Sequence, residues 1–153
     1  MARFSRTLLV AAMAAFGVSV APQFAGSANA AGCVKIHQIY YDSPGSDYGS
    51  NSSLNAEWIQ LKNTCSGDKS LNGWRIRDVS NHWYTFSSYT LKAGTKVKVH
   101  TGDGSNTRTD RYQGREWYVW NNTGGDKGFL YDSGGSRVDT CYFSGGSPGY
   151  QYC

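Results

Sequence analysis

Several common sequence patterns are missing from this chain of 153 residues. After the first thirty positions, apolar residues do not recur at helical spacing, and no stretch is apolar enough to span a bilayer. No two cysteines have the C-x-x-C spacing of a zinc site, and the three histidines form no H-x-H or H-E-x-x-H motif. These absences argue against a helical fold, a membrane-spanning protein and a typical zinc enzyme.

Signatures of catalysis are missing as well. There is no G-x-S-x-G elbow to expose a nucleophilic serine, and the serines lie in turn-like segments. Glu57, Asp78 and Glu116 are carboxylates, but nothing in the sequence pairs them for glycoside hydrolysis. We therefore predict a protein that is not an enzyme and that has no catalytic residues.

Charge of one sign is also scarce. The formal net charge is +4, and it falls to +2 if a segment that contains Arg3 and Arg6 is removed. Such a small charge gives no electrostatic reason to expect nucleic acid as the partner. Nucleic-acid binding remains a less favoured alternative.

The first thirty residues have the three parts of a secretory signal peptide. Arg3 and Arg6 give a basic start, an apolar stretch follows at 7–21, and Ala28-Asn29-Ala30 gives a small-x-small cleavage site. We expect residues 1–30 to be removed and the protein to be secreted, with no membrane span after cleavage. The remainder divides into one domain at 31–145 and a tail at 146–153.

Four cysteines follow the predicted cleavage site. An even number in an exported chain indicates two disulfides, and four cysteines allow three pairings. If strands at 34–40 and 57–63 pair antiparallel, Cys33 comes within bonding reach of Cys65. This arrangement favours Cys33–Cys65 and Cys141–Cys153, with the second bond holding back an otherwise loose tail.

What the sequence does contain is period-two alternation between glycine-rich turns. Val34, Ile36, Gln38 and Tyr40 alternate with Lys35, His37 and Ile39, as expected for the two faces of a strand. The pattern predicts an all-β fold, an antiparallel β-sandwich of about seven to nine short strands. The expected strands lie at 34–40, 57–62, 74–77, 82–86, 96–100, 117–120, 127–131 and 136–143.

An ordered set of motifs resembles the lamin tail domain. The set runs from NAEWIQLKN at 55–63 through LNGWRIRD at 71–78 to YVWNNTGGDKGFLYDSGG at 118–135. It is similar in particular to the small secreted bacterial proteins that carry this domain alone. The resemblance implies an immunoglobulin-like sandwich with a binding or anchoring role and without catalytic activity. It does not imply a ligand.

A polar run at 41–58 connects the first two expected strands. Its oxygen-bearing side chains are of the kind that calcium prefers, but their spacing is not that of an EF-hand. Turn-rich loops use the same residues to bond their own backbone, and Glu57 is expected to be a buried acid bonded to loop amides. The run therefore gives a possible calcium site, with the candidate ligands Asp42, Asp47, Asn55 and Glu57.

Aromatic residues are in excess, with five tryptophans and eleven tyrosines. Trp74 and Trp120 are expected in the core, whereas other aromatics beside hydrogen-bonding side chains suit sugar rings or unpaired bases. Packing and strand pairing alone could also explain them. The candidate ligand-binding residues are Trp58, Trp83, Arg111, Tyr112, Arg115 and Trp117.

Together these observations predict a secreted, non-enzymatic module that binds an extracellular polymer such as cell-wall glycan. One alternative is extracellular nucleic acid, bound by an arginine set whose affinity would fall with salt. Another is a protein–protein interaction or structural domain, with pairing through a sheet edge. The arginine set comprises Arg75, Arg77, Arg108, Arg111 and Arg115.

Overall fold

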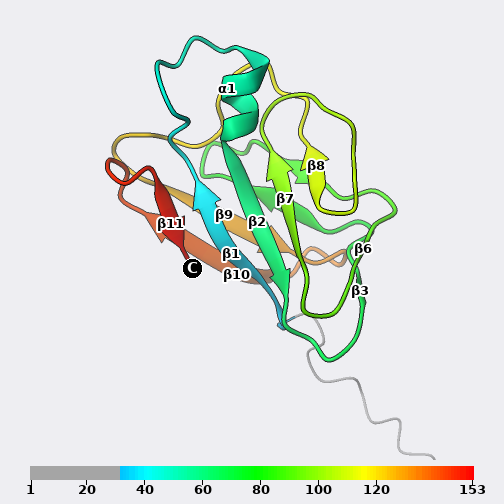
Figure 1. The fold of residues 1–153 in the computed structure, drawn as a ribbon. Coiled ribbons are helices and arrows are strands. Elements are labelled where there is room, and N and C mark those ends of the chain that lie inside the picture. Colours follow the sequence, from blue (N-terminus) through cyan, green and yellow to red (C-terminus); the bar gives the residue numbers. More distant parts are fainter. Residues whose placement is uncertain (1–31) are drawn as a thin grey trace, which may run out of the picture.

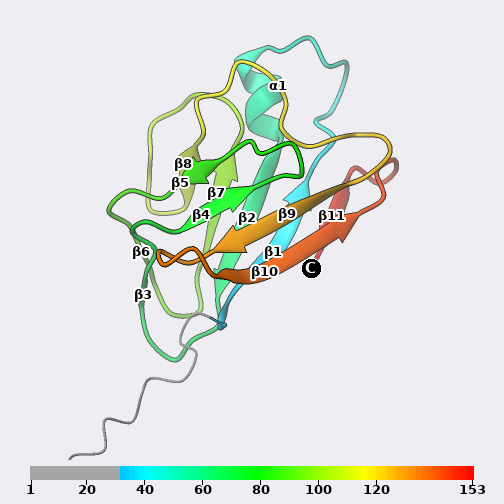
Figure 2. The same ribbon diagram turned by 180° about the vertical axis from the view of Figure 1, so that it is seen from behind.

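The computed structural model describes residues 32–153, which form eleven strands and one short helix. The predicted signal peptide at 1–30 lies outside the described residues. Two sheets face each other as layers, with the five-stranded sheet in front in Figure 1 and the four-stranded sheet in front in Figure 2. The predicted all-β sandwich is confirmed.

The five-stranded sheet contains both ends of the described chain. Its strands lie in the order β11 (Tyr150–Tyr152), β1 (Val34–Tyr40), β2 (Trp58–Asn63), β7 (Lys96–His100) and β8 (Asp110–Tyr112). All of its pairings are antiparallel except β7 with β8, which is parallel.

The four-stranded sheet has the order β10 (Arg137–Phe143), β9 (Asp126–Tyr131), β4 (Arg75–Arg77) and β5 (Tyr84–Thr85). A small third sheet pairs β3 (Lys69–Ser70) with β6 (Thr90–Leu91). The sequence did not predict β3, β6, β8 or β11, because segments of two or three residues are too short to show alternation.

The core lies between the two layers and is built by alternate residues of the strands. Ile59 and Leu61 of β2 are fully buried, as is Leu130 of β9 on the facing sheet. Gly128 lets the sheets approach closely, because a Cβ there would lie 2.7 Å from Ile39 Cδ1. Trp74 and Trp120 are buried, as the sequence predicts.

A β-bulge changes which residues of β1 face outward. The register of β1 against β2 shifts between Ile36 and Gln38, so Ile39 rather than Gln38 follows Ile36 into the core. One extra residue reverses the alternation of a strand. The predicted face of Val34, Ile36, Gln38 and Tyr40 is therefore wrong in its second half, and Tyr40 stands on the outer surface.

The run at 41–58 contains the helix α1 (Asn51–Ala56), which the sequence did not predict. The side chain of Ser50 caps the helix by accepting a hydrogen bond from the backbone N–H of Ser53. Leu54 is the one buried residue of the helix. A helix of six residues is too short to show a periodic pattern.

The predicted strand at 117–120 is wrong. The backbone N–H groups of Val119 and Trp120 donate to the carboxylate of Glu57 instead of to a neighbouring strand. Alternating aromatics mark the segment as half-buried, but its polar backbone groups bond to a side chain.

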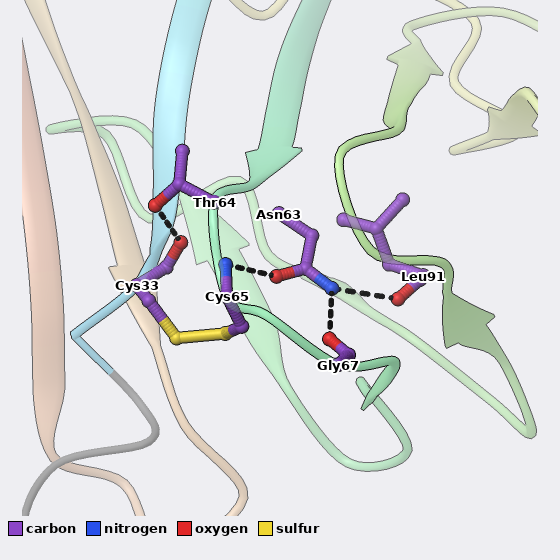
Figure 3. The surroundings of a disulfide bond; sticks show 6 residues. All are labelled: Cys33, Asn63, Thr64, Cys65, Gly67 and Leu91. Atoms are coloured by element: carbon purple, nitrogen blue, oxygen red, sulfur yellow. Dashed lines mark hydrogen bonds between the residues drawn. A yellow bond between two sulfur atoms is a disulfide. The ribbon is translucent and has the colours of Figure 1, made fainter.

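The disulfides join Cys33 to Cys65 and Cys141 to Cys153, the pairing that the strand arrangement predicts. Beside the first bond, Asn63 accepts a hydrogen bond from the backbone N–H of Cys65 and donates to the carbonyl groups of Gly67 and Leu91 (Figure 3). The buried Asn63 side chain thereby ties the disulfide turn to β6.

The C-terminal segment is not a loose tail. Residues 150–152 form β11, which pairs antiparallel with β1 at the edge of the five-stranded sheet. The Cys141–Cys153 disulfide joins the end of this segment to β10 of the opposite sheet. The disulfide and the ladder together hold an aromatic segment against the sheet.

Candidate functional site

A row of rings crosses the five-stranded sheet on its outer surface, which we call the front face. The strand registers place these rings side by side, one from each strand, because each is the Cα partner of the next. We call this set the aromatic row: Tyr150, Tyr40, Trp58, His100 and Tyr112.

The rings of the row stack in two groups, Tyr150 with Tyr40 and Trp58, and His100 with Tyr112. Tyr40 lies 5.5 Å from Trp58 and 5.9 Å from Tyr150 between ring centroids, with interplanar angles of 27° and 19°. At the other end, His100 and Tyr112 stack at 5.0 Å. The ammonium group of Lys98 lies 4.1 Å from the Trp58 ring centroid, within the range of a cation–π interaction. Stacking of this kind turns ring edges, with their polar tips, toward solvent.

The polar tips of the row have no protein partner in the described part of the chain. The hydroxyl groups of Tyr40, Tyr112 and Tyr150 and the indole N–H of Trp58 make no hydrogen bond to residues 32–153. Several tyrosine hydroxyls elsewhere are used internally: that of Tyr41 donates to Gly146, and that of Tyr89 to Arg108. The front face therefore offers donors and acceptors that the fold itself does not need.

His100 is fixed at its place in the row by a polar contact at each ring nitrogen. Its Nδ1 lies 2.7 Å from the carbonyl oxygen of Asn55, and its Nε2 lies 2.8 Å from Oδ1 of Asp110. Burial raises the pKa of Asp110, but hydrogen bonds from Thr109 and His100 outweigh it and lower the pKa overall. The ring is thus oriented by α1 on one side and by β8 on the other.

Glu57 connects the end of α1 to the segments around Thr101 and Val119 from inside the sandwich. It is fully buried, and its carboxylate accepts from the Thr101 hydroxyl at 2.6 Å and from the Val119 N–H at 2.8 Å. Burial raises the pKa of Glu57 to about 7, although these donors act in the opposite direction. The expectation of a buried acid bonded to loop amides is confirmed.

The four candidate calcium ligands lie in two groups. Asp42 and Asp47 both accept from the amide of Asn122, at 3.1 and 2.8 Å. Asn55 instead donates to the carbonyl group of Asp103, and Glu57 faces the interior. Within residues 32–153, no three His, Cys, Asp or Glu side chains form a group that could hold a metal ion. The acids of this loop organise its turns and its contact with the segment around Asn122.

Trp83 lies on the opposite surface, the outer face of the four-stranded sheet, which we call the back face. The guanidinium groups of Arg75 and Arg77 lie 4.9 and 5.4 Å from its ring centroid. Arg115 donates to the backbone carbonyl of Trp83. These three predicted arginines are thus used in contacts with a side chain or backbone of the same region.

The remaining predicted residues do not join the aromatic row, except for Trp58 and Tyr112. Arg111 points to the other side of β8, where its guanidinium group lies 4.1 Å from the centroid of Tyr89. Trp117 is 62% exposed and lies over Gly49, beside a shallow cavity that Asp47 also lines. The structure therefore distributes the predicted ligand-binding set over three separate surfaces.

Sequence reasoning missed Tyr40, His100 and Tyr150 as members of the row. Tyr40 was assigned to the wrong face because of the bulge, and Tyr150 was assigned to a loose tail. The aromatic pair Tyr150 and Tyr152, spaced by two next to a cysteine, was the signal that could have indicated an edge strand.

The family model named Lamin Tail Domain matches residues 27–145. The chain therefore belongs to the lamin tail domain family, a family of immunoglobulin-like binding or structural domains rather than of enzymes. Comparison with curated proteins gives no match.

Both disulfides fit an extracellular protein, because disulfides persist in oxidising compartments. Among the described residues, no helix is long and apolar enough to cross a membrane.

Proposed function

We propose that the protein is a secreted module that binds polysaccharide outside the cell through the aromatic row on its front face. The observation that carries the proposal is the row itself: five rings in register, whose tyrosine hydroxyls and indole N–H have no protein partner within residues 32–153. Cell-wall glycan is the first candidate ligand.

The chemistry of the row suits sugars. The aromatic rings offer apolar area for the C–H groups of a pyranose, while the tyrosine hydroxyls can donate to and accept from sugar hydroxyls. Tyrosine and tryptophan lose little conformational entropy on binding. Gln38 and Gln60 are Cα partners beside the aromatic row. Their side-chain amides add both hydrogen-bond donors and acceptors.

The row is also held rigidly before any ligand arrives. It spans five hydrogen-bonded strands, and the Cys141–Cys153 disulfide secures the end that carries Tyr150. A preorganised surface binds more tightly because less ordering is required on association. Stability and recognition are therefore supplied by the same sheet.

The test compares two tryptophans, one on each face. Trp58→Ala removes the centre of the row, whereas Trp83→Ala removes a partly exposed tryptophan from the back face. Cosedimentation with purified cell wall and with insoluble polysaccharides, using the oxidised protein, should show retention of wild type and of Trp83→Ala. Trp58→Ala should bind at least about tenfold more weakly, as expected for a central aromatic contact.

Two results would contradict the proposal. One is the absence of retention by any polysaccharide. The other is equal loss of binding in both variants while circular dichroism shows that both are folded. Loss in Trp83→Ala alone would move the site to the back face.

A further inference from the structure

A second feature of the front face lies below the aromatic row. Three lysines are Cα partners across three neighbouring strands, one each from β1, β2 and β7. We call this set the lysine row: Lys35, Lys62 and Lys96. Adjacent strands are about 4.8 Å apart, so these side chains start from closely spaced positions.

Among residues 32–153, no carboxylate lies within salt-bridge distance of the lysine row. The carboxylate pairs found there are His82–Asp78, Lys92–Asp68 and His100–Asp110. Like charges placed opposite one another on a sheet lower stability. The fold therefore maintains an unfavourable arrangement, which a bound anion would relieve.

His37 lies beside the lysine row and is affected by its positive charge. Its Nε2 lies 2.7 Å from the ammonium nitrogen of Lys96. Burial lowers the pKa of His37, and the charges of Lys96 and Lys62 lower it further. The histidine thus responds to an uncompensated positive potential on this part of the front face.

A cavity continues the lysine row past β7. It has a volume of about 200 Å³, and Lys96 lines it together with Lys92 and Arg108. The other lining residues are Tyr89 and three threonines, so the lining contains cations and hydroxyl groups but no acid. Lys92 also pairs with Asp68 at 2.7 Å, which leaves Lys96 and Arg108 as the cations for a ligand.

From this arrangement we infer that the polysaccharide bound by the front face is acidic. Its sugar rings contact the aromatic row, and its carboxylate groups lie on the lysine row, with one group entering the cavity. The inference rests on the proposed function, because it assigns a chemical class to the ligand of the same face. Lysine provides a compact point charge that accepts an anion from many directions, as binding to a repeating polymer requires.

Carboxylated glycan is favoured over nucleic acid by the way in which the arginines are used. Recognition of nucleic acid draws on arginine as well as lysine, because the planar guanidinium group binds phosphate and guanine edges through two hydrogen bonds at once. Here Arg77 and Arg111 lie over rings of their own domain, Arg77 over Phe129 and Arg111 over Tyr89, each with hydrogen bonds to protein groups. The lysine row, together with Arg108 in the cavity, provides the cations for the ligand.

The experiment uses one polymer backbone with and without charge. The probes are polygalacturonate and the same polymer fully methyl-esterified, with single-stranded DNA of similar length as a third probe. Binding is measured by isothermal titration or affinity electrophoresis at low and high salt. The variants are the triple change Lys35→Ala, Lys62→Ala, Lys96→Ala, the aromatic change Trp58→Ala, and Lys127→Ala as a lysine control on the back face.

Wild type is expected to bind polygalacturonate more tightly than its ester, with the difference reduced at high salt. The triple variant should lose about tenfold in affinity for polygalacturonate and bind the ester as wild type does. Trp58→Ala should weaken both interactions, and Lys127→Ala neither. A wild-type melting temperature for the triple variant would show that its fold is intact.

The outcomes separate the inference from the proposed function. Equal affinity for the two polymers, with no effect of the triple change, would overturn the acidic ligand and leave polysaccharide binding in place. Tighter binding of DNA than of either polymer would replace the glycan by a nucleic acid. If Trp58→Ala had no effect on any probe, the proposed function itself would fail.

Discussion

The two outer faces of this sandwich use similar residues in opposite ways. On the back face, the guanidinium group of Arg77 lies 4.2 Å from the Phe129 centroid and donates to the hydroxyl of Tyr131. On the front face, rings stack on rings, the tyrosine hydroxyls have no partner among residues 32–153, and the lysine row has no counter-ion there. On the back face, arginines cover rings and bond to their neighbours, whereas on the front face Lys98 lies over Trp58 but the lysine row lies apart from the rings.

This difference indicates which charged side chains stabilise the fold and which are available to a ligand. An arginine that covers a ring and bonds to its neighbours contributes to the stability of the free protein. Aligned lysines do the reverse, because their mutual repulsion is reduced only by an added anion or by salt. Aromatic content alone, which both faces share, does not distinguish the two roles.

The largest effect is expected where both faces depend on the same support, at Glu57. Glu57→Gln places an amide N–H toward the Trp120 N–H, and loss of a buried hydrogen bond costs about 1–3 kcal/mol. Urea unfolding should show this loss, whereas Glu116→Gln, a change at an exposed acid, should leave stability unchanged. Equal stability of both variants would remove Glu57 as a support.

Glu57 also predicts a pH dependence. Its pKa is raised from 4.5 to about 7 in the folded protein, so between these values the folded state binds more protons than the unfolded state. The contribution of Glu57 to stability is therefore present at low pH and is lost as pH rises toward 7. The difference in stability between wild type and Glu57→Gln should shrink over this range, and a constant difference would contradict the assignment.

The next effect tests the back face. Arg77→Met keeps most of the side-chain stem but removes the charge and the hydrogen bonds to Tyr131. We expect a loss of about 1–2 kcal/mol in the free energy of unfolding. If chemical denaturation showed no loss, the arginines of the back face would be available for a ligand, and the contrast between the faces would disappear.

A smaller effect of opposite sign is expected on the front face. Lys62→Met removes the middle charge of the lysine row, and we expect stability to rise by a few tenths of a kcal/mol, on the order of 0.3, at low salt. The gain should vanish at high salt because the repulsion is screened. A loss of stability comparable with that of Arg77→Met would show that the lysine row is part of the packing.

The smallest effect is a shift in one titration. Lys96→Met removes the cation nearest to His37, so the pKa of His37 should rise toward its ordinary value, as followed by NMR of the ring protons. A lowered pKa means that the unfolded chain binds the proton more readily, so His37 costs stability as pH falls below about 6.5. This cost should diminish in the variant, and an unchanged pKa would contradict the positive potential that we assign to the lysine row.

The sequence predicted where the strands lie better than it predicted which side chains share an outer face. Strands such as 96–100 were predicted with the correct bounds, since alternation of buried and exposed residues is a local property. The bulge in β1 depends on how that strand pairs with β2, so Tyr40 could not be placed from its spacing alone. The one-residue shift at the bulge places Tyr40 on the front face, where its ring stacks on Trp58.

The candidate site was predictable only in fragments. Trp58 was identified because it alternates with Ile59, whereas the lysine row depends on residues 35, 62 and 96 being partners across three strands. Such a row is formed by long-range register, which a single sequence does not show. The segment 110–120 looked like one binding stretch, but its side chains point to different sides of β8 and of the following loop.

The most direct test of the account uses the two indole N–H signals of Trp58 and Trp83 in the folded protein. In an NMR titration with polygalacturonate, we predict that the Trp58 indole signal shifts, together with the backbone amides of Gln60 and Lys98, while the Trp83 signal stays in place. A shift of the Trp83 signal with an unchanged Trp58 signal would contradict the assignment of recognition to the front face.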